Sequence, residues 1–283
     1  MTRSPDPDAA RFDVRFWGVR GTVAVPGAGT VRYGGNTACI EVLCGETRLI
    51  VDLGTGVRVL GNQLVAERAC TAHILLTHTH LDHIAGFPFF KPAYAASNRF
   101  ELWAGHLRAQ GMDLRSTLAA VMRQPLFPVP LGLMHASATF HDVTAGDTLS
   151  LGPGVSVRTA PLRHPGGATG YRIEFAGKSV AIVTDTEHDP NTPDRRVLGL
   201  IDGADLVVYD TTYTDAEFPR FVGWGHSTWE EGVRLCREAG AKRLVAFHHE
   251  PERDDGALDR IGEALDAALP GSLVAAEGAV LRP

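Results

Sequence analysis

The run His78-Thr79-His80-Leu81-Asp82-His83 constrains this chain more than any other feature. It follows the apolar stretch Ile74-Leu75-Leu76, which predicts a short buried strand ending at the run. Imidazole and carboxylate groups are good ligands for first-row divalent metals, and no structural role needs so many together. Alternate side chains of an extended chain project to one side, so His78 and His80 can reach one metal. Asp82 and His83 fall on the next turn and can face a second metal.

Further ligands must come from the ends of other predicted strands, where functional side chains are commonly placed. His164 follows a strand that we expect to end near Pro161, and Asp185 and His248 each end an apolar, strand-like run. His249 is the alternative to His248. Adjacent residues of a strand point to opposite sides, and the strand-end position favours His248.

The composition and net charge of the chain indicate which kinds of molecule it can bind. The chain has 283 residues, of which 44% are hydrophobic and 21% charged, as in an ordinary globular protein with a large core. Its net charge of -6 argues against a long nucleic acid as the main partner, because such proteins usually carry a basic surface. A small anionic substrate is compatible with this charge, since bound metal ions supply positive charge of their own.

The cysteines and the N-terminal residues predict a cytoplasmic protein. The four cysteines are irregularly spaced and form no CxxC pair, which indicates reduced or buried thiols. Residues 1–10 are rich in Pro and Asp, and we expect them to be disordered and not to act as a signal peptide. No apolar run approaches the ~20 residues that a membrane-spanning helix needs.

The order of elements predicts one domain over residues 1–283, with two sheets packed face to face and helices outside. The early strands resemble hairpins, whereas the later strands alternate with helices. We expect helices at 57–68 and 229–239 and a closing strand at 273–281. Residues 97–133 form an apolar, proline-punctuated insertion that either covers the substrate as a lid or only packs.

These motifs resemble the metallo-β-lactamase superfamily. The HxHxDH motif of that family is present as His78, His80, Asp82 and His83, and the later ligands follow in the expected order as His164, Asp185 and His248. The resemblance covers the chain from Phe16 to Phe247 and implies an α/β fold, the four-layer αββα sandwich, with two divalent metal ions. It implies that His78, His80 and His164 hold one ion, that Asp82, His83 and His248 hold the other, and that Asp185 bridges them. Zinc is the first expectation and manganese the alternative, because His/Asp ligation accepts either.

The segment Gly223-Trp224-Gly225-His226-Ser227-Thr228 resembles the His-Ser-Thr motif of the phosphodiesterase branch. This branch includes ribonuclease Z, phosphoribosyl cyclic phosphodiesterase and cyclic-nucleotide phosphodiesterases. In that branch the histidine contacts the phosphate and can protonate the leaving oxygen, a role that falls here on His226. A purely structural alternative is that Ser227 or Thr228 caps a helix beginning near Trp229. The common dizinc β-lactamases have a ligand cysteine where Asp185 stands, and glyoxalase II needs a longer C-terminal region than follows His248 here. The branch also implies a homodimer.

We therefore predict a metal-dependent phosphodiesterase that hydrolyses a small cyclic phosphodiester, in first place a cyclic nucleotide, through a hydroxide bridging the metals. Asp82 and His226 are the expected catalytic residues. The alternatives are a tRNA 3′-processing endonuclease similar to ribonuclease Z, and a lactonase or other ester hydrolase on the same metal site. The endonuclease is disfavoured because residues 97–133 carry no dense basic cluster that would grip tRNA.

Four residues are weaker candidates for contacting the substrate: Arg20 and Asn36 in glycine-rich loops, and Ser227 and Thr228 beside His226. For the two loop residues, a solvated side chain or a turn is an equally good interpretation. Asp52 and Asp210, which end apolar runs, are expected to orient ligands by hydrogen bonds.

Overall fold

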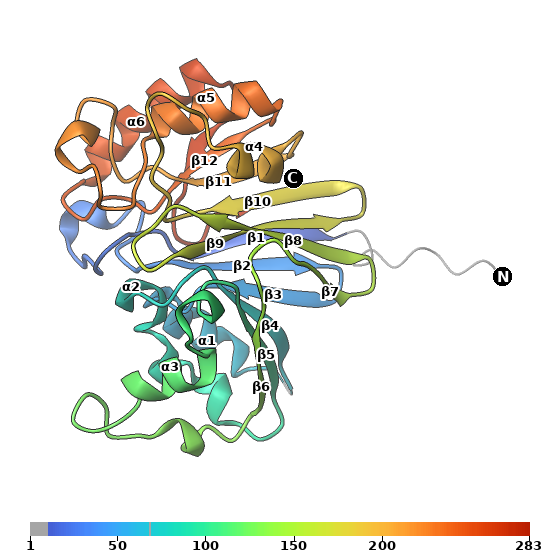
Figure 1. Cartoon of the computed structure of the whole chain (residues 1–283). Coiled ribbons are helices and arrows are strands. Elements are labelled where there is room, and N and C mark those ends of the chain that lie inside the picture. Colours follow the sequence, from blue (N-terminus) through green and yellow to red (C-terminus); the bar gives the residue numbers. More distant parts are fainter. Residues whose placement is uncertain (1–10, 68) are drawn as a thin grey trace.

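The computed structural model describes residues 11–67 and 69–283. Within that part of the chain two sheets of seven strands each lie face to face, and helices cover both outer faces (Figure 1). The predicted disorder of residues 1–10 lies outside the described residues.

The first sheet is built mainly from the N-terminal half of the chain. Its strand order is β14-β1-β2-β3-β4-β5-β6, and neighbouring strands from β3 to β6 are parallel. Its strands are β1 (Phe12–Gly18), β2 (Cys39–Cys44), β3 (Thr47–Val51), β4 (Thr71–Leu76), β5 (Arg99–Ala104), β6 (Ser137–Asp142) and β14 (Val280–Leu281). The helices of this half are α1 (Gly56–Leu64), α2 (Leu81–Ile84) and α3 (Leu114–Val121).

The second sheet is built mainly from the C-terminal half. Its strand order is β13-β12-β11-β10-β9-β8-β7, and β10 to β13 run parallel to one another. Its strands are β7 (Thr148–Gly152), β8 (Val155–Leu162), β9 (Ala168–Phe175), β10 (Lys178–Val183), β11 (Leu206–Asp210), β12 (Leu244–Phe247) and β13 (Leu273–Val274). The helices of this half are α4 (Arg195–Ile201), α5 (Trp229–Ala239) and α6 (Asp255–Ala268).

Three apolar layers hold this arrangement together. The central layer fills the space between the sheets and includes Phe16, Tyr171 and Phe247, each fully buried. A second layer packs the first sheet against α1, α2 and α3, and a third packs the second sheet against α4, α5 and α6. Burial of apolar surface on both faces of each sheet is the main stabilising term for such a sandwich. The predicted αββα architecture is confirmed.

Several elements differ from the expectations. The residues 273–281 do not form one closing strand: β13 pairs with β12 in the second sheet, and β14 pairs with β1 in the first. A turn at Gly278, whose φ is 83°, separates the two, and Glu277 anchors the turn by accepting hydrogen bonds from the backbone and side-chain nitrogens of Asn36. The residues 97–133 supply β5 and α3, so part of this segment is integral to the first sheet; its role as a lid stays a prediction.

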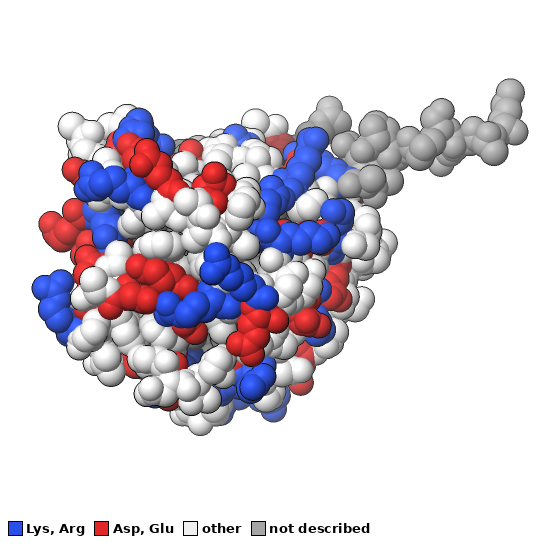
Figure 2. Space-filling model, turned by 90° about the horizontal axis from the view of Figure 1, so that it is seen from above, with Lys and Arg blue, Asp and Glu red and all other residues white. Residues whose placement is uncertain are grey.

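All four cysteines are buried and unpaired, as their spacing predicted. Among the described helices, none combines the length and apolar character that a membrane crossing requires. On the face of the molecule seen in Figure 2, both acidic and basic side chains are present.

Candidate metal centre

The predicted ligands come together where the strands of both sheets end. His78 follows β4, His164 follows β8, Asp185 follows β10 and His248 directly follows β12. The carboxyl ends of parallel strands share one edge of a sheet, and the packing of the two sheets brings these edges together.

Four residues at this edge have backbone conformations that are unusual for non-glycine residues. Asp52, Asp185 and His248 have φ values of 63°, 61° and 62°, and Thr22 has a φ of 63°. Only one other non-glycine residue in the described chain, Ala176, has a positive φ. Left-handed residues of this kind cluster at functional sites, where the surrounding structure holds them in place.

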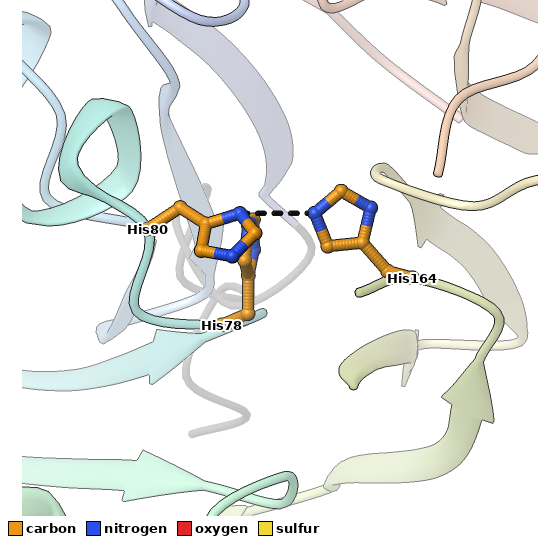
Figure 3. Close-up of side chains that lie close together, drawn as sticks. All are labelled: His78, His80 and His164. Atoms are coloured by element: carbon orange, nitrogen blue, oxygen red, sulfur yellow. Dashed lines mark hydrogen bonds between the residues drawn. The ribbon is translucent and has the colours of Figure 1, made fainter. Parts of the chain in front are cut away.

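The first group of ligands is the open triad, which we define as His78, His80 and His164. Their three rings surround one small space (Figure 3), and His80 Nδ1 lies 3.0 Å from His164 Nε2. His78 is buried, whereas His80 is exposed. The open triad therefore meets solvent on the His80 side.

The second group is the buried triad, which we define as Asp82, His83 and His248. His83 Nε2 lies 3.2 Å from Asp82 Oδ2 and 3.3 Å from His248 Nε2, and His248 Nε2 lies 3.3 Å from Asp82 Oδ2. Both histidines are completely buried. The backbone amide of Thr22 donates a hydrogen bond of 2.8 Å to Asp82 Oδ2 and fixes that carboxylate.

Asp185 lies between the triads. Its Oδ1 is 3.2 Å from His248 Nε2 and 3.7 Å from His78 Nε2, and its Oδ2 is 3.3 Å from His83 Nε2. One carboxylate thus reaches nitrogen atoms of both triads, which is the position that a bridging ligand needs.

Hydrogen bonds behind the ligands orient their rings. His83 Nδ1 donates to Asp52 Oδ2 at 2.8 Å, and Asp52 also accepts from the amide and hydroxyl of Thr77. His164 Nδ1 donates to the Gly225 carbonyl at 2.8 Å, and His248 Nδ1 lies 3.0 Å from Thr212 Oγ1. When Nδ1 is used in this way, Nε2 is left with its lone pair for a metal.

Charges in this cluster shift one another's pKa values. Burial lowers the pKa of His78 well below its usual range, and the neighbouring His83 lowers it further. Burial alone would raise the pKa of Asp82 and of Asp185, but His83 and His248 lower both pKa values below the usual range. Burial alone would lower the pKa of His83, but the carboxylates around it, Asp185 first, raise it well above its usual range. Carboxylates bind a metal in the ionised form and imidazoles in the neutral form, so an ion bound at His83 would displace a proton.

The residues fit a divalent-metal site. Donor atoms of the open triad lie within 4.8 Å of one another, and so do those of the buried triad together with Asp185. Among the described residues, His78 Nε2 is a buried nitrogen without a hydrogen-bond partner, although buried polar atoms are nearly always paired. A metal ion at the centre of the cluster would satisfy this atom.

His226 lies beside the metal ligands and has its own carboxylate partner. Its Nδ1 donates to Asp210 Oδ2 at 2.9 Å, and its ring stacks on that of His248 with 4.9 Å between centroids. Burial alone would lower the pKa of His226, but Asp210, assisted by Asp185 and Asp82, raises it to about 9. Asp210 therefore stabilises the protonated ring and leaves Nε2 free to donate.

His249 points away from the cluster. Its Nε2 donates to the Ala275 carbonyl at 2.8 Å, and burial lowers its pKa to about 3. His248 is thus the member of this pair that lies among the candidate ligands.

The two loop candidates for substrate contact are engaged within the protein. Arg20 is completely buried, and its guanidinium donates to the carbonyls of Gly34 and Arg253 at 2.9 and 2.7 Å. Asn36 donates to Glu277 and accepts from the Thr55 hydroxyl. These contacts favour a structural role for both residues over the contact with substrate that the sequence suggested.

Ser227 and Thr228 are likewise buried. Ser227 Oγ lies 2.8 Å from His188 Nδ1 and 3.0 Å from the Tyr209 hydroxyl. Thr228 is the N-cap of α5: its Oγ1 accepts from the Glu231 amide at 3.0 Å. Both residues support the loop that carries His226, and their geometry favours this role over direct contact with substrate.

Two residues near the ligands were not anticipated. His106, just after β5, lies with Nε2 3.1 Å from Thr79 Oγ1, and burial lowers its pKa to about 4. Glu187 is buried and accepts hydrogen bonds from the amides of Gly223 and Gly225. Like the predicted ligands, His106 follows an apolar strand, so its position in the sequence could have identified it. No feature of the sequence indicates a role for Glu187.

Comparison with known proteins identifies relatives of this chain. A family model described as beta-lactamase superfamily domain matches residues 47–249. Ribonuclease BN of Salmonella typhi is 30% identical over 136 residues, which are 48% of this chain and only 40% of that protein. The match thus spans about two-fifths of the length of this curated relative.

Two solved structures share the fold. YhfI from Bacillus subtilis, described as a metallo-beta-lactamase fold protein, superposes with a TM-score of 0.71 at 17% identity, covering 96% of this chain and 100% of that one. A diphosphatase of the PhnP family superposes with a TM-score of 0.68 at 19% identity, covering 96% and 98%. The family model spans residues 47–249, which are most of the chain, and the fold match covers 96% of it; this protein belongs to the beta-lactamase superfamily of metallo-β-lactamase-fold hydrolases.

Proposed function

We propose that this protein is a divalent-metal-dependent phosphodiesterase whose substrate is a small cyclic phosphodiester of the cyclic-nucleotide class. The observation that carries the proposal is the pair His226–Asp210 beside the candidate metal ligands. Hydrolysis of a carboxylic ester or lactone at the same metal ligands does not need an additional histidine that is hydrogen-bonded to a carboxylate. The names of the relatives, a ribonuclease and a diphosphatase, support hydrolysis of a bond between phosphorus and oxygen.

The open and buried triads, with Asp185 between them, would hold two divalent ions. Such a pair of ions polarises a phosphoryl oxygen and lowers the pKa of water. Asp82 would orient the attacking water and accept its proton as the water oxygen bonds to phosphorus and the P–O bond to the leaving oxygen breaks. His226 would donate its Nε2 proton to the leaving oxygen, while Asp210 stabilises the imidazolium through Nδ1.

The substrate is expected to be small. The net charge of -6 disfavours a long polyanion, and the face shown in Figure 2 carries charges of both signs. The ribonuclease relative nevertheless makes RNA cleavage the first competing activity to test.

The test is hydrolysis of 2′,3′- and 3′,5′-cyclic nucleotides, beside a precursor tRNA and a lactone, with Zn²⁺ and with Mn²⁺. We expect turnover of a cyclic nucleotide that is lost in Asp185→Ala and falls about 10²- to 10⁴-fold in His226→Ala. His135→Ala, which changes an exposed histidine elsewhere, is the matched control.

A substrate with a better leaving group tests the role of His226 directly. Bis(p-nitrophenyl) phosphate releases p-nitrophenolate, which needs no proton, so His226→Ala should slow its hydrolysis much less than that of the cyclic nucleotide. Cleavage of only the tRNA or the lactone would refute the proposed substrate class. An equal loss on both phosphodiesters would refute proton donation by His226.

A further inference from the structure

Four large apolar side chains are exposed on segments that also carry or contact candidate metal ligands. They are Val23, Leu81, Val222 and Trp224, with exposed fractions of 53%, 69%, 61% and 62%, and we call them the apolar rim. Single exposed apolar residues are common on protein surfaces, but a group of them around a polar centre marks a binding surface.

Each segment of the rim is connected to the metal centre. Leu81 lies between His80 and Asp82 in the chain. Val23 follows Thr22, whose amide donates to Asp82. Trp224 precedes Gly225, whose carbonyl accepts from His164 and whose Cα lies so close that a Cβ would come within 2.3 Å of His164 Nδ1.

The backbone on both sides of Trp224 is fixed by hydrogen bonds to one carboxylate. One carboxylate oxygen of Glu187 accepts hydrogen bonds from the Gly223 amide at 2.7 Å and from the Gly225 amide at 2.9 Å. Both glycines have positive φ values, 93° and 86°, which a residue with a side chain rarely adopts. The buried Glu187 thus fixes the backbone around a side chain that stays mostly in solvent.

The indole of Trp224 packs against a neighbouring aromatic ring. Trp224 meets Phe221 edge to face at 5.5 Å, and Phe221 stacks on Tyr213 at 4.3 Å with an interplanar angle of 3°. A flat aromatic group held in this way and left exposed is suited to stacking on a planar ligand, since little entropy is lost when the ligand binds.

We infer that Trp224, with the rest of the apolar rim, forms a subsite that stacks on the heteroaromatic base of the substrate. The inference rests on the proposed function, because the base would be the part of a cyclic nucleotide that extends from the metal-bound phosphate. Arg20, Asn36, Ser227 and Thr228 are engaged in the scaffold and do not compete for this role. Stacking on an aromatic side chain accepts any base, so the subsite recognises the class and not one nucleotide.

The experiment measures binding, so that it does not depend on turnover. Calorimetric titration of the metal-loaded protein with AMP and with ribose 5-phosphate separates the base from the sugar phosphate. We expect AMP to bind about tenfold more tightly than ribose 5-phosphate, Trp224→Ala to remove that difference, and Trp224→Phe to restore most of it. Val65→Ala, which truncates an exposed residue remote from the rim, is the control.

Tryptophan fluorescence gives a second readout. AMP should quench the wild-type emission and that of Trp103→Phe, but not that of Trp224→Phe, although the last variant still binds. The melting temperatures of the variants verify that they fold.

The outcomes separate the inference from the proposed function. Loss of the AMP preference in Trp224→Ala supports the subsite even if no cyclic phosphate is hydrolysed. The absence of hydrolysis would refute only the proposed reaction. Equal affinities for AMP and ribose 5-phosphate, or an unchanged AMP affinity in Trp224→Ala, overturn the subsite. A wild-type dimer that Trp224→Ala converts to a monomer with full AMP affinity would also overturn it and assign the rim to a second copy of the chain.

Discussion

The open triad and the buried triad use similar ligands in different surroundings. The open triad has three histidines and meets solvent at His80, whereas His83 and His248 of the buried triad are completely enclosed. The buried triad is also supported more heavily, by Asp52 behind His83 and by Thr212 behind His248. This difference indicates that the buried triad would anchor its ion firmly, while the open triad would present its ion to the substrate.

The largest effect is expected where the two triads meet. Asp185→Asn keeps the size of the side chain but removes the charge that both triads contact, so we expect activity to fall roughly 10³-fold or more and the metal content to fall below two ions per chain. Elemental analysis of the purified variant, together with its turnover rate, checks this. A variant with two ions and normal turnover would show that Asp185 is not shared.

Removal of one histidine from each triad should have unequal results. His80→Ala is expected to lose one ion and leave the metal-free fold nearly unchanged, because His80 is the exposed member of the open triad. His248→Ala should lose the other ion and also lower the free energy of unfolding of the metal-free protein by about 2–4 kcal/mol, because it opens a cavity in a buried region. Metal content and urea unfolding measure the two effects, and equal destabilisation by both substitutions would contradict the asymmetry.

A smaller effect on metal affinity is expected for the carboxylate that is hydrogen-bonded to a ligand of the buried triad. Asp52→Asn weakens the hydrogen bond that orients His83, and we expect a 10- to 100-fold loss of metal affinity at that triad with the open triad unaffected. Competition with a chromophoric chelator would measure both affinities.

Asp205→Asn is the matched control, since Asp205 is a buried carboxylate bonded to Lys178, Lys242 and the Ser179 amide. It should leave both metal affinities unchanged. If Asp52→Asn also leaves them unchanged, Asp52 does not position a ligand.

The smallest effect concerns Asp205 itself and the dependence of stability on pH. Burial alone would raise the pKa of Asp205, but Lys242, the Ser179 amide and Lys178 lower it below its usual range. Its contribution to stability, about 1–2 kcal/mol, is therefore present above pH ~4 and is lost as the pH falls through the lower folded pKa. The difference in unfolding free energy between wild type and Asp205→Asn, measured in urea at pH 6 and pH 3, should shrink at the lower pH; a difference that grows would contradict this sign.

The sequence predicted the layers of the fold because its strands are apolar runs whose order and turns are clear. It also indicated where the ligands gather, since His78, His164, Asp185 and His248 each follow such a run. The division of 273–281 between two sheets could not be predicted, because it depends on a turn that Glu277 fixes by hydrogen bonds to a distant loop.

The weaker site candidates illustrate the same limit. Arg20 looked available in a glycine-rich loop, yet the folded chain surrounds its guanidinium with carbonyl oxygens. Glu187 looked like an ordinary charged residue, yet it fixes the loop around Trp224. Such roles depend on long-range contacts, which local patterns do not encode.

The left-handed backbone of Asp185, His248 and Thr22 has a consequence for the evolution of this protein. Each such residue costs the folded state on the order of 1 kcal/mol, and glycine would relieve that cost. At His248, however, glycine would also open the cavity expected for His248→Ala, and that larger cost outweighs the relief of strain. A laboratory selection for heat resistance alone should therefore accept glycine at the exposed Thr22, whose backbone amide would still reach Asp82, and should keep His248. Variants selected for both heat resistance and turnover should keep Asp185 and His248 and gain their stability elsewhere in the sandwich.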